Sequence, residues 1–106
     1  MELKNTINQM VSEDYKERFK AEYWQTKIRY EKLKKFNTRI EAANITQHSL
    51  NTRVEMPVHD CPDHLLMEQQ NIMGTYLHIL EVRAEVEGID LKQAEDLNCL
   101  VFEGKI

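Results

Sequence analysis

The stretch SEDYKERFKAEYWQTKIRYEKLKKF, from Ser12 to Phe36, decides the fold because it mixes aromatic residues with charged ones and contains no glycine or proline. Ser12 has the residue type preferred at a helix N-cap, and two acidic residues follow it. We therefore predict one long helix over residues 13–43. Its apolar stripe at helical spacing comprises Tyr15, Phe19, Tyr23, Tyr30, Leu33, Phe36 and Ile40.

The rest of the chain predicts three more helices and one linker. The N-terminal apolar residues have helical spacing and predict a short helix over 2–11. Residues 44–60 show no sustained period and form the linker. Pro62 suits the first helical turn and Gly88 a C-terminal cap, which predicts a second long helix over 62–87. Asp90 with Gln93 resembles a capping box and predicts a last short helix over 91–99.

These elements predict a single all-α domain over residues 1–106, in which the two long helices form an antiparallel hairpin. Trp24 and Ile28 lie opposite the main stripe of the first long helix, so a hairpin alone leaves apolar residues uncovered. We therefore expect a homo-oligomer, a helical bundle with Trp24 and Ile28 at the subunit interface. The second long helix has one apolar face, formed by Leu66, Met73, Leu77, Leu80 and Ala84. Four further apolar residues widen this face: Leu65, Ile72, Tyr76 and Ile79.

Composition and charge exclude several classes of protein. The formal net charge is −4, with Lys/Arg concentrated in the first half and Asp/Glu in the second. A pI near 5.6 argues against general nucleic-acid binding. Two cysteines make no disulfide framework, and no stretch approaches a membrane span or a signal peptide. These features indicate a cytoplasmic protein with no membrane partner.

The candidate binding residues are polar residues that lie within or beside the apolar stripes, together with aromatic residues of the first stripe. One interpretation is an ion-pair network, such as Arg18 with Glu22, or Arg29 with Glu81 or Glu85 of the second long helix. The other is a pocket in which arginines bind phosphate and aromatic rings stack on a base. The candidate ligand-binding residues are Arg18, Phe19, Glu22, Tyr23, Thr26, Arg29, Tyr30 and Arg83. Trp24 could either be buried at a subunit interface or stack on a base of the ligand, and the subunit interface is favoured.

Catalytic and metal chemistry find little support in the sequence. The run His59-Asp60-Cys61-Pro62-Asp63-His64 holds metal-capable groups, but it lacks the second ligand pair of a zinc site and reads better as a helix start. No phosphate-binding glycine loop and no nucleophile–base arrangement is present in the sequence. We therefore expect no enzyme, no metal and no cofactor.

The motifs MELKNTINQM…SEDYKERFKAEYWQTKIRYEKL and CP…LL…Q…M…YL…LEVRAEVEGIDL, which span Met1 to Leu91 apart from the linker, resemble small helical proteins of Firmicutes phages and prophages, a crAss-like-phage-related family. At fold level the chain is also similar to phage hairpin proteins that sequester nucleotide immune signals, the anti-CBASS and anti-Thoeris sponges. The charged and aromatic residues of the matched motifs are Tyr15, Lys16, Arg18, Phe19, Glu22, Tyr23, Arg29, Tyr30, Glu81, Arg83, Glu85 and Glu87.

The resemblance implies a phage-encoded, non-enzymatic oligomer that binds a small nucleotide signal in the cytoplasm of the host bacterium. Arginines would contact phosphate or ribose, and aromatic rings would stack on the base. The alternative is a helical protein–protein interaction module, an inhibitor or adaptor that uses Trp24 and the acidic second helix. A third class, an enzyme that cleaves such signals, has no identifiable catalytic group.

Overall fold

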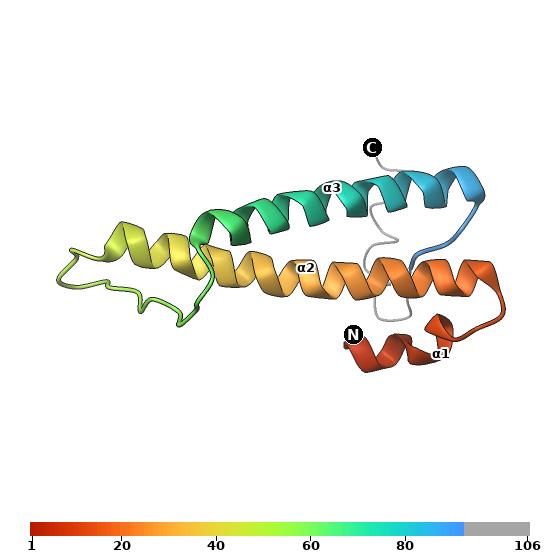
Figure 1. Cartoon of the computed structure of the whole chain (residues 1–106), viewed down its shortest axis with the longest axis horizontal. Coiled ribbons are helices and arrows are strands. Elements are labelled where there is room, and N and C mark those ends of the chain that lie inside the picture. The colour runs from red at the N-terminus through yellow and green to blue at the C-terminus, as the bar shows by residue number, and fades with distance from the viewer. Residues whose placement is uncertain (93–106) are drawn as a thin grey trace. The chain divides into compact units, whose positions relative to one another are not determined.

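The computed structural model of the chain describes residues 1–92. Its elements, in chain order, are a 3-10 helix η1 (Leu3–Thr6) and the helices α1 (Ile7–Met10), α2 (Tyr15–Thr46) and α3 (Asp63–Glu87) (Figure 1). No strand occurs among these residues, so the all-α prediction is confirmed for them. None of the described helices is both long enough and apolar enough to span a membrane.

The start of α2 uses a different cap from the one that the sequence suggests. The N–H of Lys16 donates to Asp14 Oδ1 at 3.0 Å, the bond expected of an N-cap at Asp14. Ser12 Oγ accepts from the N–H of Asp14 at 3.0 Å and closes the preceding turn. The helix therefore begins at Tyr15, two residues after the expected start.

The end of α2 lies three residues beyond the expected one, at Thr46. Thr46 Oγ1 donates to the Ala42 carbonyl at 2.8 Å and accepts from the N–H of Val54 at 2.9 Å. One hydroxyl thus closes the last helical turn and holds the returning linker. The segment between α2 and α3, residues 47–62, contains no helix or strand.

Gly88 ends α3 as the sequence predicts. Its φ is +69°, the left-handed conformation that a Cβ disfavours, and the N–H of Ile89 donates to the Ala84 carbonyl at 2.8 Å. Of the short helix expected over 91–99, only Leu91 and Lys92 lie within the described residues, and neither is helical.

Replacing Gly88 with alanine should lower the free energy of unfolding by about 1 kcal/mol, because alanine at positive φ is strained. Chemical denaturation of the variant measures the loss. Gly88→Asn is the matched control, and a smaller loss is expected because asparagine tolerates this conformation better. Equal losses in both variants would show that φ is not the cause.

The chain divides into two compact units, each with its own core. The first comprises residues 1–25 and the described residues from His78 onward. Cross-helix hydrogen bonds in this unit join Tyr15 with Glu87 and Tyr23 with Glu81, so the two helical segments run antiparallel. Its core residues are Phe19, Ala21, Tyr23, Leu80, Ala84 and Ile89.

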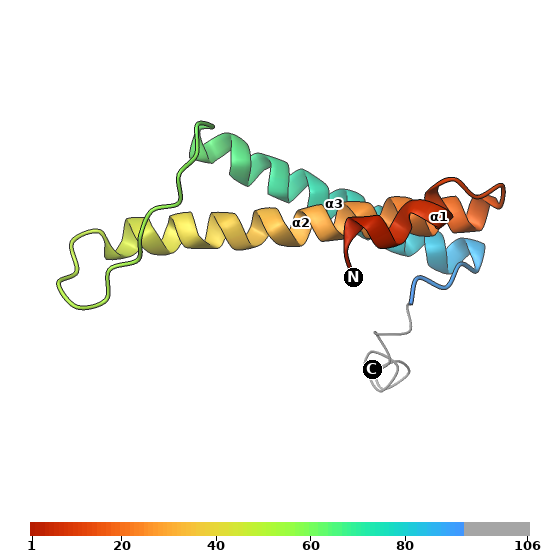
Figure 2. The same ribbon diagram turned by 90° about the horizontal axis from the view of Figure 1, so that it is seen from below.

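The N-terminal residues complete the first unit by packing on α2, as Figure 2 shows. Gln25 Nε2 donates to Oγ1 of the fully buried Thr6 at 2.9 Å, and Gln9 Nε2 donates to Glu17 Oε2 at 3.2 Å. The sequence predicts one helix over 2–11, whereas the structure has η1 followed by α1.

The second unit, Thr26–Leu77, is built around a buried asparagine. Asn37 Nδ2 donates to the Leu66 carbonyl at 3.1 Å and to Gln70 Oε1 at 2.8 Å. Ile40, Ala43 and Leu77 are the buried apolar residues of this unit. Gly74 lies under the Tyr30 ring, whose Cε1 would be 3.3 Å from a Cβ at that position, which accounts for a glycine inside α3.

Candidate functional site

The first unit contains a cluster of polar and aromatic groups centred on Arg83 of α3. Arg83 Nε and Nη2 both lie 3.0 Å from Oε2 of Glu87, one turn further along the same helix. Arg83 Nη2 also donates to the hydroxyl of Tyr15 on α2, and that hydroxyl donates to Glu87 Oε1 at 3.0 Å. Three side chains from two helices therefore form a closed ring of hydrogen bonds.

An aromatic ring supports the guanidinium from one side. Arg83 Cζ lies 5.0 Å from the centroid of the buried Phe19 ring, within the range of a cation–π contact. The Tyr15 ring meets Phe19 edge-on, with centroids 6.2 Å apart. The hydrogen bond that Glu87 accepts raises the pKa of the Arg83 guanidinium above its ordinary value, and the charge of Glu87 adds to this effect. Arg83 is thus a fixed, permanently charged and solvent-exposed cation.

A second tyrosine–glutamate pair lies further along the same helices. The buried Tyr23 donates its hydroxyl hydrogen to Oε2 of the exposed Glu81 at 2.7 Å. The Tyr23 ring also meets Trp24 edge-on, with centroids 5.1 Å apart. The first unit therefore presents two exposed or half-buried carboxylates, each oriented by a tyrosine.

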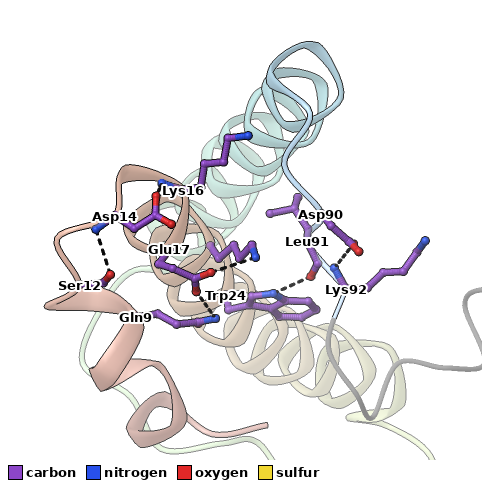
Figure 3. A network of polar contacts seen from close by, with 10 residues as sticks. Gln9, Ser12, Asp14, Lys16, Glu17, Trp24, Asp90, Leu91 and Lys92 are labelled. Carbon is purple, nitrogen blue, oxygen red and sulfur yellow. Dashed lines mark hydrogen bonds and ion pairs between the residues drawn. The ribbon is translucent and has the colours of Figure 1, made fainter.

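Trp24 has a partner in its own chain. Its Nε1 donates to the Leu91 carbonyl at 2.8 Å, and the Lys92 N–H donates to Asp90 Oδ1 at 2.9 Å in the same segment (Figure 3). The indole is half-buried, and so is Ile28. The expected subunit contact through Trp24 and Ile28 remains a prediction. In such a contact the Trp24 N–H would keep its hydrogen bond to the Leu91 carbonyl, and only the ring surface would meet the other subunit.

The eight candidate ligand-binding residues are divided between the two units. Phe19 and Arg83 are brought into contact in the first unit, where Tyr23 lies nearby on α2. Arg18 and Glu22 belong to the same unit and are exposed, and Arg18 Nη1 donates to the Ser12 carbonyl at 2.8 Å.

The other three candidates belong to the second unit. Thr26 and Tyr30 are half-buried there, and Arg29 is exposed. The expected partners of Arg29, Glu81 and Glu85, belong to the first unit. The structure therefore assembles a cluster around Arg83 and places the Thr26–Tyr30 group in the other unit.

Three residues of the first unit were not among the candidate binding residues: Tyr15 and Glu87 of the Arg83 cluster, and Glu81 of the second tyrosine–glutamate pair. The i, i+4 spacing of Arg83 and Glu87 could have identified that pair. The two tyrosine–glutamate bonds depend on the register between α2 and α3, which spacing within one helix does not give.

The histidine- and cysteine-containing run before α3 forms a helix start. His59 Nδ1 lies 2.8 Å from the Cys61 carbonyl oxygen, and its Nε2 lies 3.3 Å from Asp63 Oδ1. The imidazole also meets the Phe36 ring edge-on. Among residues 1–92, no three His, Cys, Asp or Glu side chains come together as metal ligands.

Comparison with known proteins identifies one family. The family model described as Sequestin matches residues 13–86, which is more than half of the chain and includes nearly all of α2 and α3. Phe19, Tyr23, Glu81 and Arg83 lie inside the matched range, and Glu87 is the residue just beyond it. No curated protein and no solved structure matches the chain.

Proposed function

The chain belongs to the Sequestin family, and from this premise we propose that it is a non-enzymatic sponge that sequesters a small nucleotide immune signal. The signal would be a cyclic nucleotide or an ADP-ribose derivative. The protein would be phage-encoded and act in the cytoplasm of the host bacterium, where removal of the signal blocks anti-phage defence. The family name supports sequestration, and the resemblance to phage sponges supports the ligand class.

The observation that carries this function is the Arg83 guanidinium, held in place by Glu87 and Tyr15 over the Phe19 ring. Glu87 and Tyr15 engage Nε and Nη2 of this guanidinium, and its Nη1 can donate charge-assisted hydrogen bonds to phosphate oxygens. The carboxylates of Glu81 and Glu87 can accept hydrogen bonds from ribose hydroxyls. Exposed tyrosine ring surface can stack on a base. Binding of this kind requires no nucleophile and no general base.

The assembly supplies the enclosure that a small ligand needs. We propose that the two long helices form one antiparallel hairpin, because contacts within each unit run antiparallel: Tyr15–Glu87 and Tyr23–Glu81 in the first, Tyr30–Gly74 and Asn37–Leu66 in the second. Hairpins of several copies associate into a bundle through Trp24 and Ile28. Ligand pockets are concave and bury most of the ligand surface, and a bundle can provide such pockets between its subunits.

A thermal-shift panel of cyclic dinucleotides and ADP-ribose derivatives tests the function. A ligand that binds only the folded state stabilises it by about 2.7 kcal/mol at a hundred-fold excess over Kd, which raises the melting temperature. Mononucleotides such as AMP, at the same concentration, control for unspecific phosphate effects. A folded protein whose melting temperature no member of the panel raises would contradict the sponge.

A second candidate function is a helical protein–protein interaction module. It is favoured by the exposed apolar residues of α3, among them Ile72 and Val86. Host proteins retained by the immobilised chain, and lost on Trp24→Ala, would support this function if the nucleotide panel gives no shift.

A further inference from the structure

The Arg83 guanidinium has few hydrogen-bond donors left for a ligand. A guanidinium carries five N–H groups, which form one fork between Nε and Nη2 and a second fork between Nη2 and Nη1. Glu87 Oε2 lies 3.0 Å from both Nε and Nη2 and fills the first fork. Nη2 also donates to the Tyr15 hydroxyl, which takes one arm of the second fork. A phosphate therefore meets the two N–H groups of Nη1, and it finds a complete fork only if Glu87 or Tyr15 moves away.

The Glu87 carboxylate occupies the position that a phosphate would otherwise take. Carboxylate and phosphate compete for the same fork, because each presents two oxygens to its parallel N–H groups. Glu87 is held through both of its oxygens, since Oε1 accepts from the Tyr15 hydroxyl at 3.0 Å. Its side chain is 31% exposed, so water screens the pair less than it screens a pair on an open surface. A phosphate that displaced Glu87 would leave a half-buried carboxylate without its cation, which is costly.

The stability of α3 does not account for a carboxylate at this position. Glu87 is the last residue of α3, where the helix dipole favours cations, and the last turn of α3 contains no basic residue. The pair also has its cation four residues before its anion, which is the weaker of the two orders on a helix. The effect of Glu87 on Arg83 is therefore the better explanation of its presence.

The surroundings of Arg83 within the first unit are acidic. The described residues of this unit, 1–25 and 78–92, contain nine Asp/Glu and six Lys/Arg. Glu81, which accepts from Tyr23, and Glu85 are each two residues from Arg83 along α3. Repulsion from these carboxylates grows in proportion to the charge of the ligand. A phosphate with two negative charges is consequently disfavoured more strongly than a phosphate with one.

We propose that Glu87 determines specificity at this site by excluding terminal phosphate monoesters while admitting phosphates that bridge two groups. This role rests on the proposed function. A phosphate monoester carries about −1.5 to −2 charges at neutral pH. Each phosphate of a cyclic nucleotide or of the ADP-ribose pyrophosphate bridges two groups and carries one negative charge. The neutral Arg83–Glu87 pair offers such a phosphate the Nη1 donors, and it leaves the second charge of a monoester uncompensated.

Isothermal titration calorimetry with AMP, a terminal monoester, tests the exclusion. Glu87→Gln keeps the size of the side chain and an acceptor oxygen for Arg83 but removes the competing charge. We expect this variant to bind AMP at least about ten-fold more tightly than the unmodified chain. Its affinity for the nucleotide found in the thermal-shift panel should change less than about three-fold. The double variant Arg83→Met/Glu87→Gln should lose the gain for AMP, because the donors of Arg83 are then absent.

Glu85→Gln is the matched control, because it removes the same charge from the same helix and Glu85 is exposed. Its affinity for AMP should stay within about three-fold of the unmodified chain. Equal gains in the Glu85 and Glu87 variants would show that net charge, and not Glu87, excludes the monoester. Unchanged or weaker AMP binding by Glu87→Gln, or a gain that persists in the double variant, would also overturn the role. Far-UV circular dichroism verifies that each variant keeps its helices.

The same titrations separate the role of Glu87 from the proposed function. If no nucleotide of the panel binds the unmodified chain, the sponge fails. A gain for AMP in Glu87→Gln that depends on Arg83 would then still show that Glu87 excludes monoesters from Arg83. If a panel nucleotide binds and Glu87→Gln gains no affinity for AMP, the sponge stands and the role of Glu87 fails.

Discussion

Asn37→Asp is expected to lower the free energy of unfolding by about 3 kcal/mol or more at neutral pH. Asn37 is only 3% exposed, and its amide nitrogen donates to two oxygens, the Leu66 carbonyl and Gln70 Oε1. A carboxylate at this position cannot donate either bond, and it would place a negative charge next to the two oxygens that now accept from Asn37. Such an uncompensated buried charge is among the most destabilising single changes in a protein core.

Urea denaturation at several pH values measures this loss. Burial raises the folded-state pKa of the introduced carboxyl above its unfolded value, so the deficit is present above the unfolded pKa and disappears as pH falls toward about 4. Asn37→Leu is the control: it removes the same two hydrogen bonds and the Oδ1 that lacks a hydrogen-bond partner in the structure, but it adds no charge, so its loss should be smaller and independent of pH. A pH-independent deficit, or equal losses in both variants, would contradict the buried contact.

Arg83→Met should weaken nucleotide binding by about ten- to a hundred-fold, which corresponds to the loss of a charge-assisted hydrogen bond to phosphate. Methionine keeps part of the length and the contact with Phe19 but removes the charge and every donor. Arg83→Lys should give an intermediate affinity, because lysine retains the charge without the planar fork. Isothermal titration calorimetry measures the three affinities.

Arg39→Met is the matched control for Arg83, since Arg39 is an exposed arginine of α2 in the other unit. The affinity of the Arg39→Met variant for the nucleotide should equal that of the unmodified chain. Equal weakening at Arg83 and Arg39 would show that general positive charge, and not the Arg83 cluster, attracts the ligand.

The sequence is sufficient to predict the helices because their determinants are local. The periodic stripe of Tyr15 to Ile40 predicts α2, and Pro62 with Gly88 defines the limits of α3 to within one residue. The start of α2 was misplaced because both Ser12 and Asp14 can cap a helix. Its end was misplaced because the Thr46 hydroxyl depends on Val54, whose position follows from the path of the linker.

Contacts between elements were harder to predict, because they depend on register and on the path of irregular segments. Phe19 and Arg83 were both named as binding residues, but their contact follows from the alignment of α2 with α3. The hydrogen bond from Trp24 Nε1 to the Leu91 carbonyl was not predicted, because Leu91 was expected to begin a short helix and the path of the chain after Gly88 does not follow from local spacing. Leu65, Ile72 and Ile79 were expected to widen the packed face of α3, and they are exposed because the apolar face of α3 is wider than the packing against α2 covers.

Mass spectrometry of the nucleotide released by heat from the purified protein tests sequestration most directly. The protein is incubated with the signal that shifts its melting temperature, separated from free ligand by gel filtration, and then denatured. We expect the unmodified chain to release the signal intact, and Arg83→Met to release much less. A chain that retains no nucleotide, or that returns a chemically altered one, would contradict non-enzymatic sequestration.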